Sequence, residues 1–216
     1  MSYATASSRY GLREAPGGLS LVQDFVNTRA IAGHGDLLAD PDTASSWARS
    51  ATERWAASRD WAAARDRAAS SDVAAPYVAL TGADLRHLRE LRTTFELLVG
   101  GPTYGGPERD MSRPDAAGQQ AIAAPVAATL VPDSGAVELE PTGSGWRWFA
   151  SALWIETYRS QQDGTWLRLK RCRNTQCGST FYDSSRNNSS VWHDVRTCGN
   201  VANLRASRAR RRGDAH

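Results

Sequence analysis

The sequence predicts a mainly α-helical fold with one small β-hairpin and a separate C-terminal module. Three observations carry this prediction. Apolar residues recur at helical spacing through much of the first 165 residues. A single stretch with two apolar runs around a turn sequence has the pattern of a hairpin. All 3 cysteines lie within the last 45 residues, where the excess positive charge is also concentrated.

The first helices are expected in the N-terminal third of the chain. Residues 1–18 have no apolar periodicity, and we predict a flexible N-terminus there. The apolar spacing in 19–30 predicts a helix. Another helix is expected to begin with Asp40 as its N-cap and Pro41 at its first position, since proline suits that position. The alanine-rich sequence up to residue 71 then predicts one long helix or two helices with a break.

The middle of the chain alternates helix signals with breakers. Thr81 and Asp84 resemble a capping box, and the apolar residues behind them share one helix face. The glycine- and proline-rich residues 100–118 predict a loop or hinge. The two apolar runs around Pro132–Gly135 then predict the hairpin.

One further helix and one strand lead to the C-terminal module. Residues 146–158 are apolar on nearly all sides, which predicts a buried helix. The alternating residues 165–172 lead the chain to Cys172. We therefore expect a helical domain over 19–165, a basic module over 166–212 and a tail over 213–216.

Charge is distributed unevenly between these two parts. The net charge of the chain is +3, but residues 168–212 contain 11 basic and 2 acidic side chains and so carry +9. The rest of the chain carries −6. A basic end on a mildly acidic body points to a polyanionic partner.

The cysteines and one histidine have the spacing of a metal site. Cys172, Cys177, His193 and Cys198 form the pattern Cys-x4-Cys-x15-His-x4-Cys. Two ligand pairs, each closed by a short loop, are how structural zinc sites are assembled. Three thiolates and one imidazole would fill all four zinc positions and leave none for an activated water. The spacing therefore predicts one structural Zn²⁺ per chain and favours it over a disulfide or independent buried thiols.

This part of the sequence resembles the CGNR zinc finger. The resemblance rests on the following residues: Cys172, Cys177, Phe181, Asp183, Ser185, Asn187, Trp192, Cys198, Gly199 and Asn200. The upstream segments 21–47 and 85–95 resemble the helical ABATE domain, which precedes this finger in bacterial proteins regarded as stress-induced transcription regulators. The resemblance implies a finger of the treble-clef or ribbon type that ends in a basic helix and binds double-stranded DNA.

The sequence departs from the family pattern at two positions. His193 stands where the family has a third cysteine, and histidine is also a zinc ligand. Val201 stands where the family has the arginine of its name. If that arginine contacts phosphate or braces the finger, its replacement weakens the case for nucleic-acid binding.

The basic residues at the C-terminus are the candidate DNA contacts. Arg205, Arg208 and Arg212 recur at helical spacing and Arg211 flanks them, while Arg186 and Arg196 are secondary candidates. A solvated tail is the alternative reading of this arginine run. We expect Val201 and Leu204 to pack near the zinc knuckle. The aromatic residues Phe181, Tyr182 and Trp192 are expected to close the finger's small core rather than stack on bases.

The helical domain has few features that identify a site. Asp24, Asn27 and Thr28 lie in an apolar stretch and, with Trp146, Trp148 and Trp154, could line a ligand pocket. Internal hydrogen bonding is the favoured reading of the three polar residues. The sequence contains no phosphate-binding glycine loop, Gly-x-Ser-x-Gly or His-Glu-x-x-His, so no catalytic residue is assigned.

The sequence thus predicts a cytoplasmic, DNA-binding transcription regulator. It has no secretory signal and no stretch long enough to span a bilayer. The alternatives are a small-molecule-binding protein or enzyme of the same lineage that keeps the finger only as structure, and a protein adaptor. A small-molecule effector and a homodimer are compatible with the sequence, which specifies neither.

Overall fold

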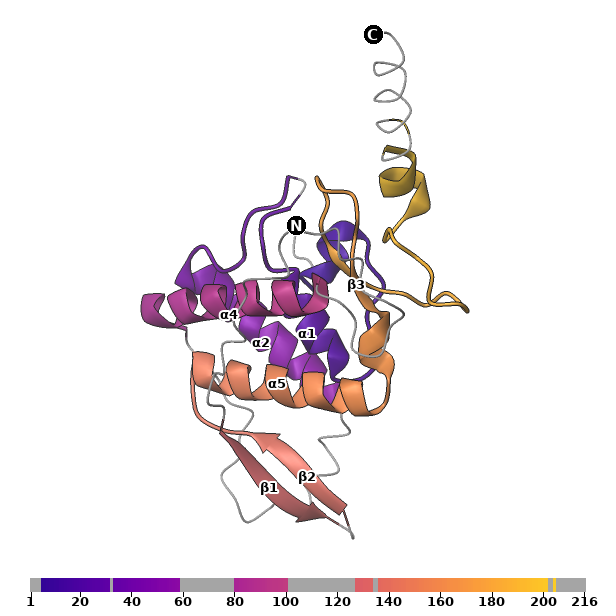
Figure 1. Cartoon of the computed structure of the whole chain (residues 1–216). Helices are drawn as coiled ribbons and strands as arrows, with labels where there is room; N and C mark the ends of the chain where they lie inside the picture. Colours follow the sequence, from indigo (N-terminus) through magenta and orange to yellow (C-terminus); the bar gives the residue numbers. More distant parts are fainter. Residues whose placement is uncertain are drawn as a thin grey trace, which may run out of the picture.

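The computed structural model describes residues 5–31, 33–58, 80–100, 127–133, 136–201 and residue 204 (Figure 1). The fold is mainly helical, as the sequence predicts, and it has two small antiparallel hairpins: the predicted β1–β2 and a second one, β3–β4, in the C-terminal module. In chain order the elements are η1 (Ser7–Tyr10), α1 (Leu19–Val26), α2 (Pro41–Ser58), α4 (Gly82–Gly100), β1 (Ala128–Asp133), β2 (Ala136–Pro141), α5 (Trp146–Gln162), η3 (Thr165–Arg168), β3 (Leu169–Arg171), β4 (Thr180–Tyr182) and the π-helical turn η4 (Val195–Gly199).

The short helix α1 lies at the centre of the helical body and contacts α2, α4 and α5. Its Phe25 ring lies 6.0 Å from the Trp47 ring of α2 and 6.1 Å from the Phe95 ring of α4. Trp47 in turn stacks on Phe149 of α5, with the ring centroids 5.5 Å apart. Aromatic side chains therefore join all four helices into one core, because each buries a large apolar area.

Local sequence signals set the beginnings of two of these helices. Asp40 caps α2 by accepting a hydrogen bond of 2.9 Å from the backbone N–H of Thr43. At α4, the N–H of Thr81 donates to Asp84 Oδ2 (2.9 Å), and the N–H of Asp84 donates to Thr81 Oγ1 (3.3 Å). Both caps confirm the sequence interpretation.

The N-terminal segment corrects the sequence interpretation. Residues 5–18, which we predicted to be flexible, contain η1 and several buried side chains. Arg9 is only 8% exposed and donates hydrogen bonds to the carbonyls of Asn27, Arg29 and Gly35. Polar contacts with residues distant in the sequence hold this segment in place. Such contacts leave no apolar periodicity in the sequence from which they could be predicted.

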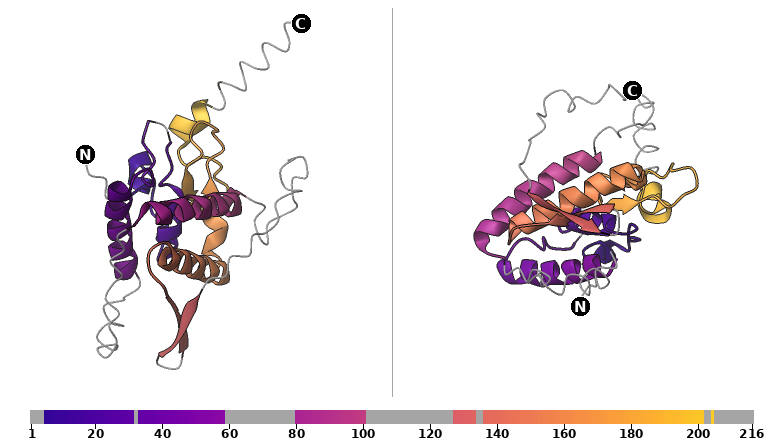
Figure 2. Two further views of the ribbon diagram at one scale, coloured as in Figure 1. Left: turned by 90° about the vertical axis from the view of Figure 1, so that its left-hand side faces the viewer. Right: turned by 90° about the horizontal axis from the view of Figure 1, so that it is seen from below.

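The β1–β2 hairpin projects from the helical body on the side opposite the C-terminal module (Figures 1 and 2). Its register pairs Leu130 with Leu139 and Val131 with Glu138, which places alternate residues on opposite faces. Arg159 of α5 contacts the Glu138 carboxylate, so the polar face is held against the body. Leu130 and Val137, on the other face, are 66% and 65% exposed.

Several sequence predictions concern residues outside the described ranges. These are the continuation of the alanine-rich helix through 59–71, the loop at 101–118 and the tail at 213–216. Among the helices that the structure does describe, none has the length and apolarity needed to cross a bilayer.

Candidate metal centre

The first ligand pair is brought together by the β3–β4 hairpin. Cys172 follows β3 and donates its backbone N–H to the carbonyl of Ser179 (2.8 Å). The tight turn between the strands is closed by the Asn174 carbonyl, which accepts from the N–H groups of Cys177 (2.8 Å) and Gly178 (2.9 Å). Gly178 has a φ of +60°, a conformation that glycine adopts without strain. The turn places the Cys177 thiol beside that of Cys172.

The second pair is fixed at the start of the π-helical turn η4. The side chain of Asp194 caps this turn by accepting from the N–H of Arg196 (2.7 Å), and its carbonyl accepts from the N–H of Cys198 (3.0 Å). Gly199 lies against the Trp192 ring, and a Cβ at that position would be 3.3 Å from the ring. This packing positions His193 and Cys198 on the side of the turn that faces the hairpin.

The four side chains meet in one cluster of suitable size for a zinc ion. The ligand atoms of Cys172, Cys177, His193 and Cys198 all lie within 4.8 Å of one another. His193 Nδ1 is 3.4 Å from the Cys177 sulfur and 3.6 Å from the Cys198 sulfur. Zinc bonds of about 2.3 Å to sulfur and about 2.1 Å to nitrogen give a tetrahedral edge of about 3.6 Å. The donor set and its dimensions therefore fit zinc.

The electrostatics of the first ligand pair favour one thiolate and one protonated thiol. Hydrogen bonding between Cys172 and Cys177 lowers the pKa of Cys177 to about 3 and raises the pKa of Cys172, so one proton is shared by the pair. The Cys177 thiolate in turn raises the pKa of His193 through their hydrogen bond. A divalent cation would replace the shared protons, because metal binding requires thiolates and neutral imidazole.

Neighbouring side chains orient the ligands. Asn174 Nδ2 donates to the Cys198 sulfur (3.3 Å), and Ser179 Oγ lies 3.1 Å from the Cys177 sulfur. Phe181 and Trp192 pack with the cysteines into a small apolar cluster to which Leu12 also contributes. Their place in this cluster agrees with the expectation that these two rings close the finger. Tyr182 differs from that expectation, because it packs on the core of the helical body.

A buried ion pair holds the long loop between the two ligand pairs. Asp183 is 1% exposed and accepts from Lys170 Nζ (2.7 Å) and from the N–H groups of Ser185 (2.9 Å) and Ser190 (2.8 Å). Burial opposes ionisation of Asp183, but these hydrogen bonds outweigh it and lower the pKa of the carboxyl. Sequence reasoning noted Asp183 only as part of a motif and did not find this role.

Asn27 joins the helical body to the finger. Its side-chain amide donates to the Thr180 carbonyl (2.8 Å) and accepts from the Thr180 N–H (2.9 Å), so it pairs with β4 as a neighbouring strand would. Gln23 Nε2 also lies 3.4 Å from the same carbonyl. Asn27 is fully buried, and both of its polar atoms are used in this joint.

The other residues considered for a ligand pocket also have internal partners. Asp24 accepts hydrogen bonds from the Ser7 N–H (2.8 Å) and from Trp47 Nε1 (2.9 Å). Thr28 donates to the Phe25 carbonyl and accepts from Arg92.

The three tryptophans of α5 contact different partners. Trp146 stacks on His87, Trp148 meets the Trp55 ring edge to face, and Trp154 packs on Phe95. The three tryptophans and the three polar residues described above therefore contact different parts of the protein. This arrangement does not support a pocket that all six would line.

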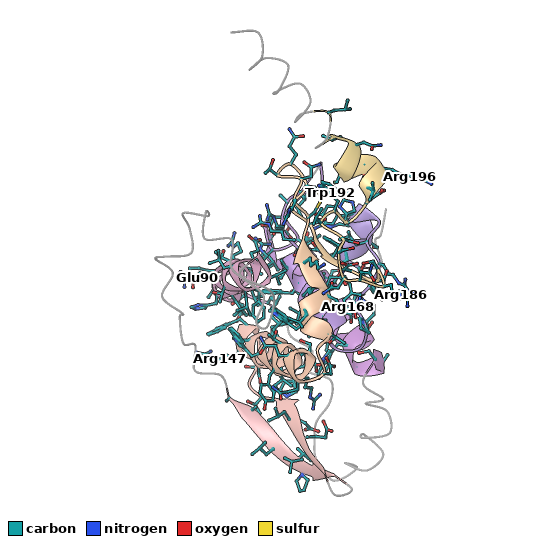
Figure 3. All side chains as sticks on the ribbon, turned by 45° about the vertical axis from the view of Figure 1, so that its right-hand side comes forward. Glu90, Arg147, Arg168, Arg186, Trp192 and Arg196 are labelled. Atoms are coloured by element: carbon teal, nitrogen blue, oxygen red, sulfur yellow. The ribbon has the colours of Figure 1, made fainter. Side chains whose placement is uncertain are left out.

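The candidate DNA contacts fall into two groups. Arg186 and Arg196 are exposed, and both extend from the finger toward the same side in Figure 3. Arg205, Arg208, Arg211 and Arg212 lie outside the described residues.

The structure corrects the expected packing of Val201 and Leu204, which are 36% and 57% exposed. The apolar cluster of the finger consists of the three cysteines and Phe181, with Leu12 and Trp192 packed against it, and neither Val201 nor Leu204 belongs to it.

The comparison with protein families agrees with this geometry. The model of the CGNR zinc finger matches residues 168–211, a range that contains all four clustered side chains. A comparison with the curated proteins finds none that matches this chain. The ABATE resemblance of the upstream residues remains a prediction. The C-terminal module is thus a zinc-finger domain of the CGNR type, attached to a helical body whose family is open.

Proposed function

We propose that this protein is a DNA-binding transcription regulator whose finger is held in shape by one zinc ion. The observation that carries the proposal is the complete Cys172, Cys177, His193 and Cys198 cluster. With four protein ligands the metal has no free position for water, so it would serve structure rather than catalysis. A rigid finger is useful when it presents side chains to a partner.

The charge of the finger indicates the class of partner. Residues 168–212 carry +9, whereas the rest of the chain carries −6. Arginine guanidinium groups suit contacts to phosphates and to guanine edges. Arg186 and Arg196 would supply contacts from the finger, and Arg205, Arg208, Arg211 and Arg212 would supply them from the segment that follows.

The helical body supports a structural or regulatory role more than an enzymatic one. Its buried polar residues Asp24, Asn27 and Thr28 are engaged in hydrogen bonds within the protein. Such internal partners are the usual fate of buried polar groups. The body would thus position the finger, while an effector or a second copy remains compatible with the proposal.

The test is a selection of double-stranded DNA with the zinc-loaded full-length protein at two salt concentrations. A chain truncated after Asn203 is selected in parallel. Enrichment of one motif that disappears on truncation supports a sequence-reading regulator with contacts in the C-terminal segment. Salt-sensitive binding without a motif would mean that the basic C-terminal segment binds DNA only through its charge and reads no sequence. If the full-length protein binds no duplex at low salt, the regulator proposal is wrong.

A further inference from the structure

Two arginines from different parts of the chain converge at the turn of the zinc-binding hairpin. A Cβ at Gly178 would lie 3.5 Å from Nε and Nη2 of Arg171 and 3.8 Å from Nη1 of Arg29. Both guanidinium groups therefore lie within 4 Å of one point on the turn. Arg171 belongs to β3 of the finger, and Arg29 follows α1 in the helical body.

The backbone of Arg29 is held by hydrogen bonds from the N-terminal segment. Its carbonyl accepts from Arg9 Nη2 (3.2 Å) and from the Tyr10 hydroxyl (3.0 Å). Two residues earlier, Asn27 is bonded to both backbone groups of Thr180, which itself follows Gly178 by two positions. The body and the finger are thus joined two residues from Arg29 and two residues from Gly178, so the segments that carry the two arginines are held together before any ligand arrives.

Among the described residues, the carboxylates around this pair do not neutralise both guanidinium charges. Glu96 lies 3.5 Å from Arg29 Nη1, and within the part of the chain that the structure describes it is the one acid at ion-pair distance from either arginine. Within the described residues, Arg171 has no carboxylate at ion-pair distance, and its side chain is exposed. A guanidinium group has five N–H donors, so Arg29 keeps donors free beside its contact with Glu96.

We propose that Arg29 and Arg171 form a composite phosphate-binding site for the backbone of double-stranded DNA. The inference rests on the proposed DNA-binding function and deepens it, because it places one contact on the helical body. Phosphate contacts from two elements fix the orientation of a protein on the duplex. The helical body would therefore help to set how the finger and the arginine-rich segment approach DNA.

The same arginines could have a second role, at the metal centre, which the experiment must distinguish from phosphate binding. Three thiolates around Zn²⁺ leave a net negative charge, and both arginines lie close to Gly178, the residue that follows Cys177. They could serve only to neutralise the metal centre. In that case their replacement would weaken zinc retention, whereas a phosphate site predicts that zinc retention stays unchanged.

The experiment measures binding of a fluorescent 20-base-pair duplex of mixed sequence to the full-length zinc-loaded protein across a salt series. The variants are Arg29→Gln, Arg171→Gln and the double variant. Arg147→Gln is the matched control, because Arg147 is exposed at the start of α5, stacks on Trp146 and lies away from the finger (Figure 3). Zinc retention is measured on every protein by competition with a coloured chelator.

We expect each single variant to lower the slope of log affinity against log salt by about one, and the double variant by about two. Affinity at 0.1 M salt should fall by about fivefold to tenfold per variant, with Arg147→Gln and zinc retention unchanged.

Each other outcome overturns the inference in a distinct way. If the unmodified protein binds DNA and the variants match Arg147→Gln, the composite site is wrong and the regulator proposal stands. If the unmodified protein binds no duplex at low salt, both proposals fail. Loss of zinc in the variants assigns the arginines to the metal centre. Tighter binding of duplex RNA with the same slope change assigns the site to RNA.

Discussion

The helical body and the finger are stabilised by different kinds of interaction. The body buries Phe25, Phe95 and Phe149 completely, within a core that extends over α1, α2, α4 and α5. The buried apolar cluster of the finger consists of Phe181 and the three cysteines, with Leu12 and Trp192 at its edge. The free energy gained by burying so small a cluster cannot offset the conformational entropy that the finger loses when it becomes ordered. The comparison shows that the body folds by apolar burial and the finger by ligands and polar contacts.

The largest expected effect is the removal of zinc. Chelation should unfold residues 168–201 and leave the body folded, since structural zinc contributes on the order of 10 kcal/mol. Hydrogen exchange followed by mass spectrometry measures the two regions separately. We expect loss of protection in β3 and β4 and unchanged protection in α1 and α5.

His193→Ala should produce the same pattern at limiting zinc, because it removes one of the four ligands. His87→Ala is its control, since His87 lies on the surface of α4 beside Trp146. If His193→Ala retains zinc as tightly as His87→Ala does, the ligand assignment is wrong.

A substitution in the core of the helical body should destabilise the body and not the finger. Phe149→Ala removes a fully buried ring that stacks on Trp47, and we expect the free energy of unfolding to fall by about 3–5 kcal/mol. Tyr158→Ala on the same helix is the control, because Tyr158 is 55% exposed. Denaturant titration of both variants, with zinc bound, measures the difference. Equal stabilities would contradict the view that this aromatic core stabilises the body.

Asp183→Asn tests the polar contribution to the finger. It removes the charge that pairs with Lys170, and we expect a loss of about 3 kcal/mol from finger stability, measured by hydrogen exchange in β3 and β4. The lowered pKa of Asp183 means that its stabilising effect is present above the unfolded value, about pH 4, and is lost as pH falls toward the lower folded pKa.

The difference between Asp183→Asn and the unmodified protein should therefore be constant from about pH 8 to pH 5 and shrink below about pH 4. Protonation of the zinc ligands affects both proteins alike. A difference that already shrinks near neutral pH would mean that the ionised Asp183 is not the stabilising form.

The joint between the two regions gives the smallest expected effect. Asn27→Ala leaves the buried N–H and carbonyl of Thr180 without this partner, which should cost about 2 kcal/mol. Asn187→Ala, at an exposed position of the finger, is the control. We expect faster hydrogen exchange at β4 in Asn27→Ala, although zinc remains bound. Unchanged exchange would show that the finger is independent of the body.

The sequence predicted well where local rules operate. The caps at Asp40 and Thr81 depend on a few neighbouring residues, and the ligand spacing around Cys172 and Cys198 depends on loop closure. Patterns of this kind are visible in a single sequence because the interacting groups lie close together in the chain.

The features that sequence reasoning missed depend on long-range polar contacts. Arg9 reaches the carbonyls of Asn27 and Gly35, and Asn27 reaches Thr180 across more than 150 positions. The convergence of Arg29 with Arg171 is of the same kind. Hydrogen bonds between distant residues leave no periodic signal. The N-terminal segment therefore looked flexible, and the sequence favoured internal hydrogen bonding for Asn27 without giving its partner.

The central claim is that zinc serves as a closed structural site in the finger. X-ray absorption spectroscopy of the zinc-loaded full-length protein tests it most directly. We expect three sulfur ligands at about 2.3 Å and one nitrogen at about 2.0 Å, with no further ligand. Two sulfurs with two or more nitrogen or oxygen ligands would contradict it, because such a shell would contain water and the metal would be open to chemistry.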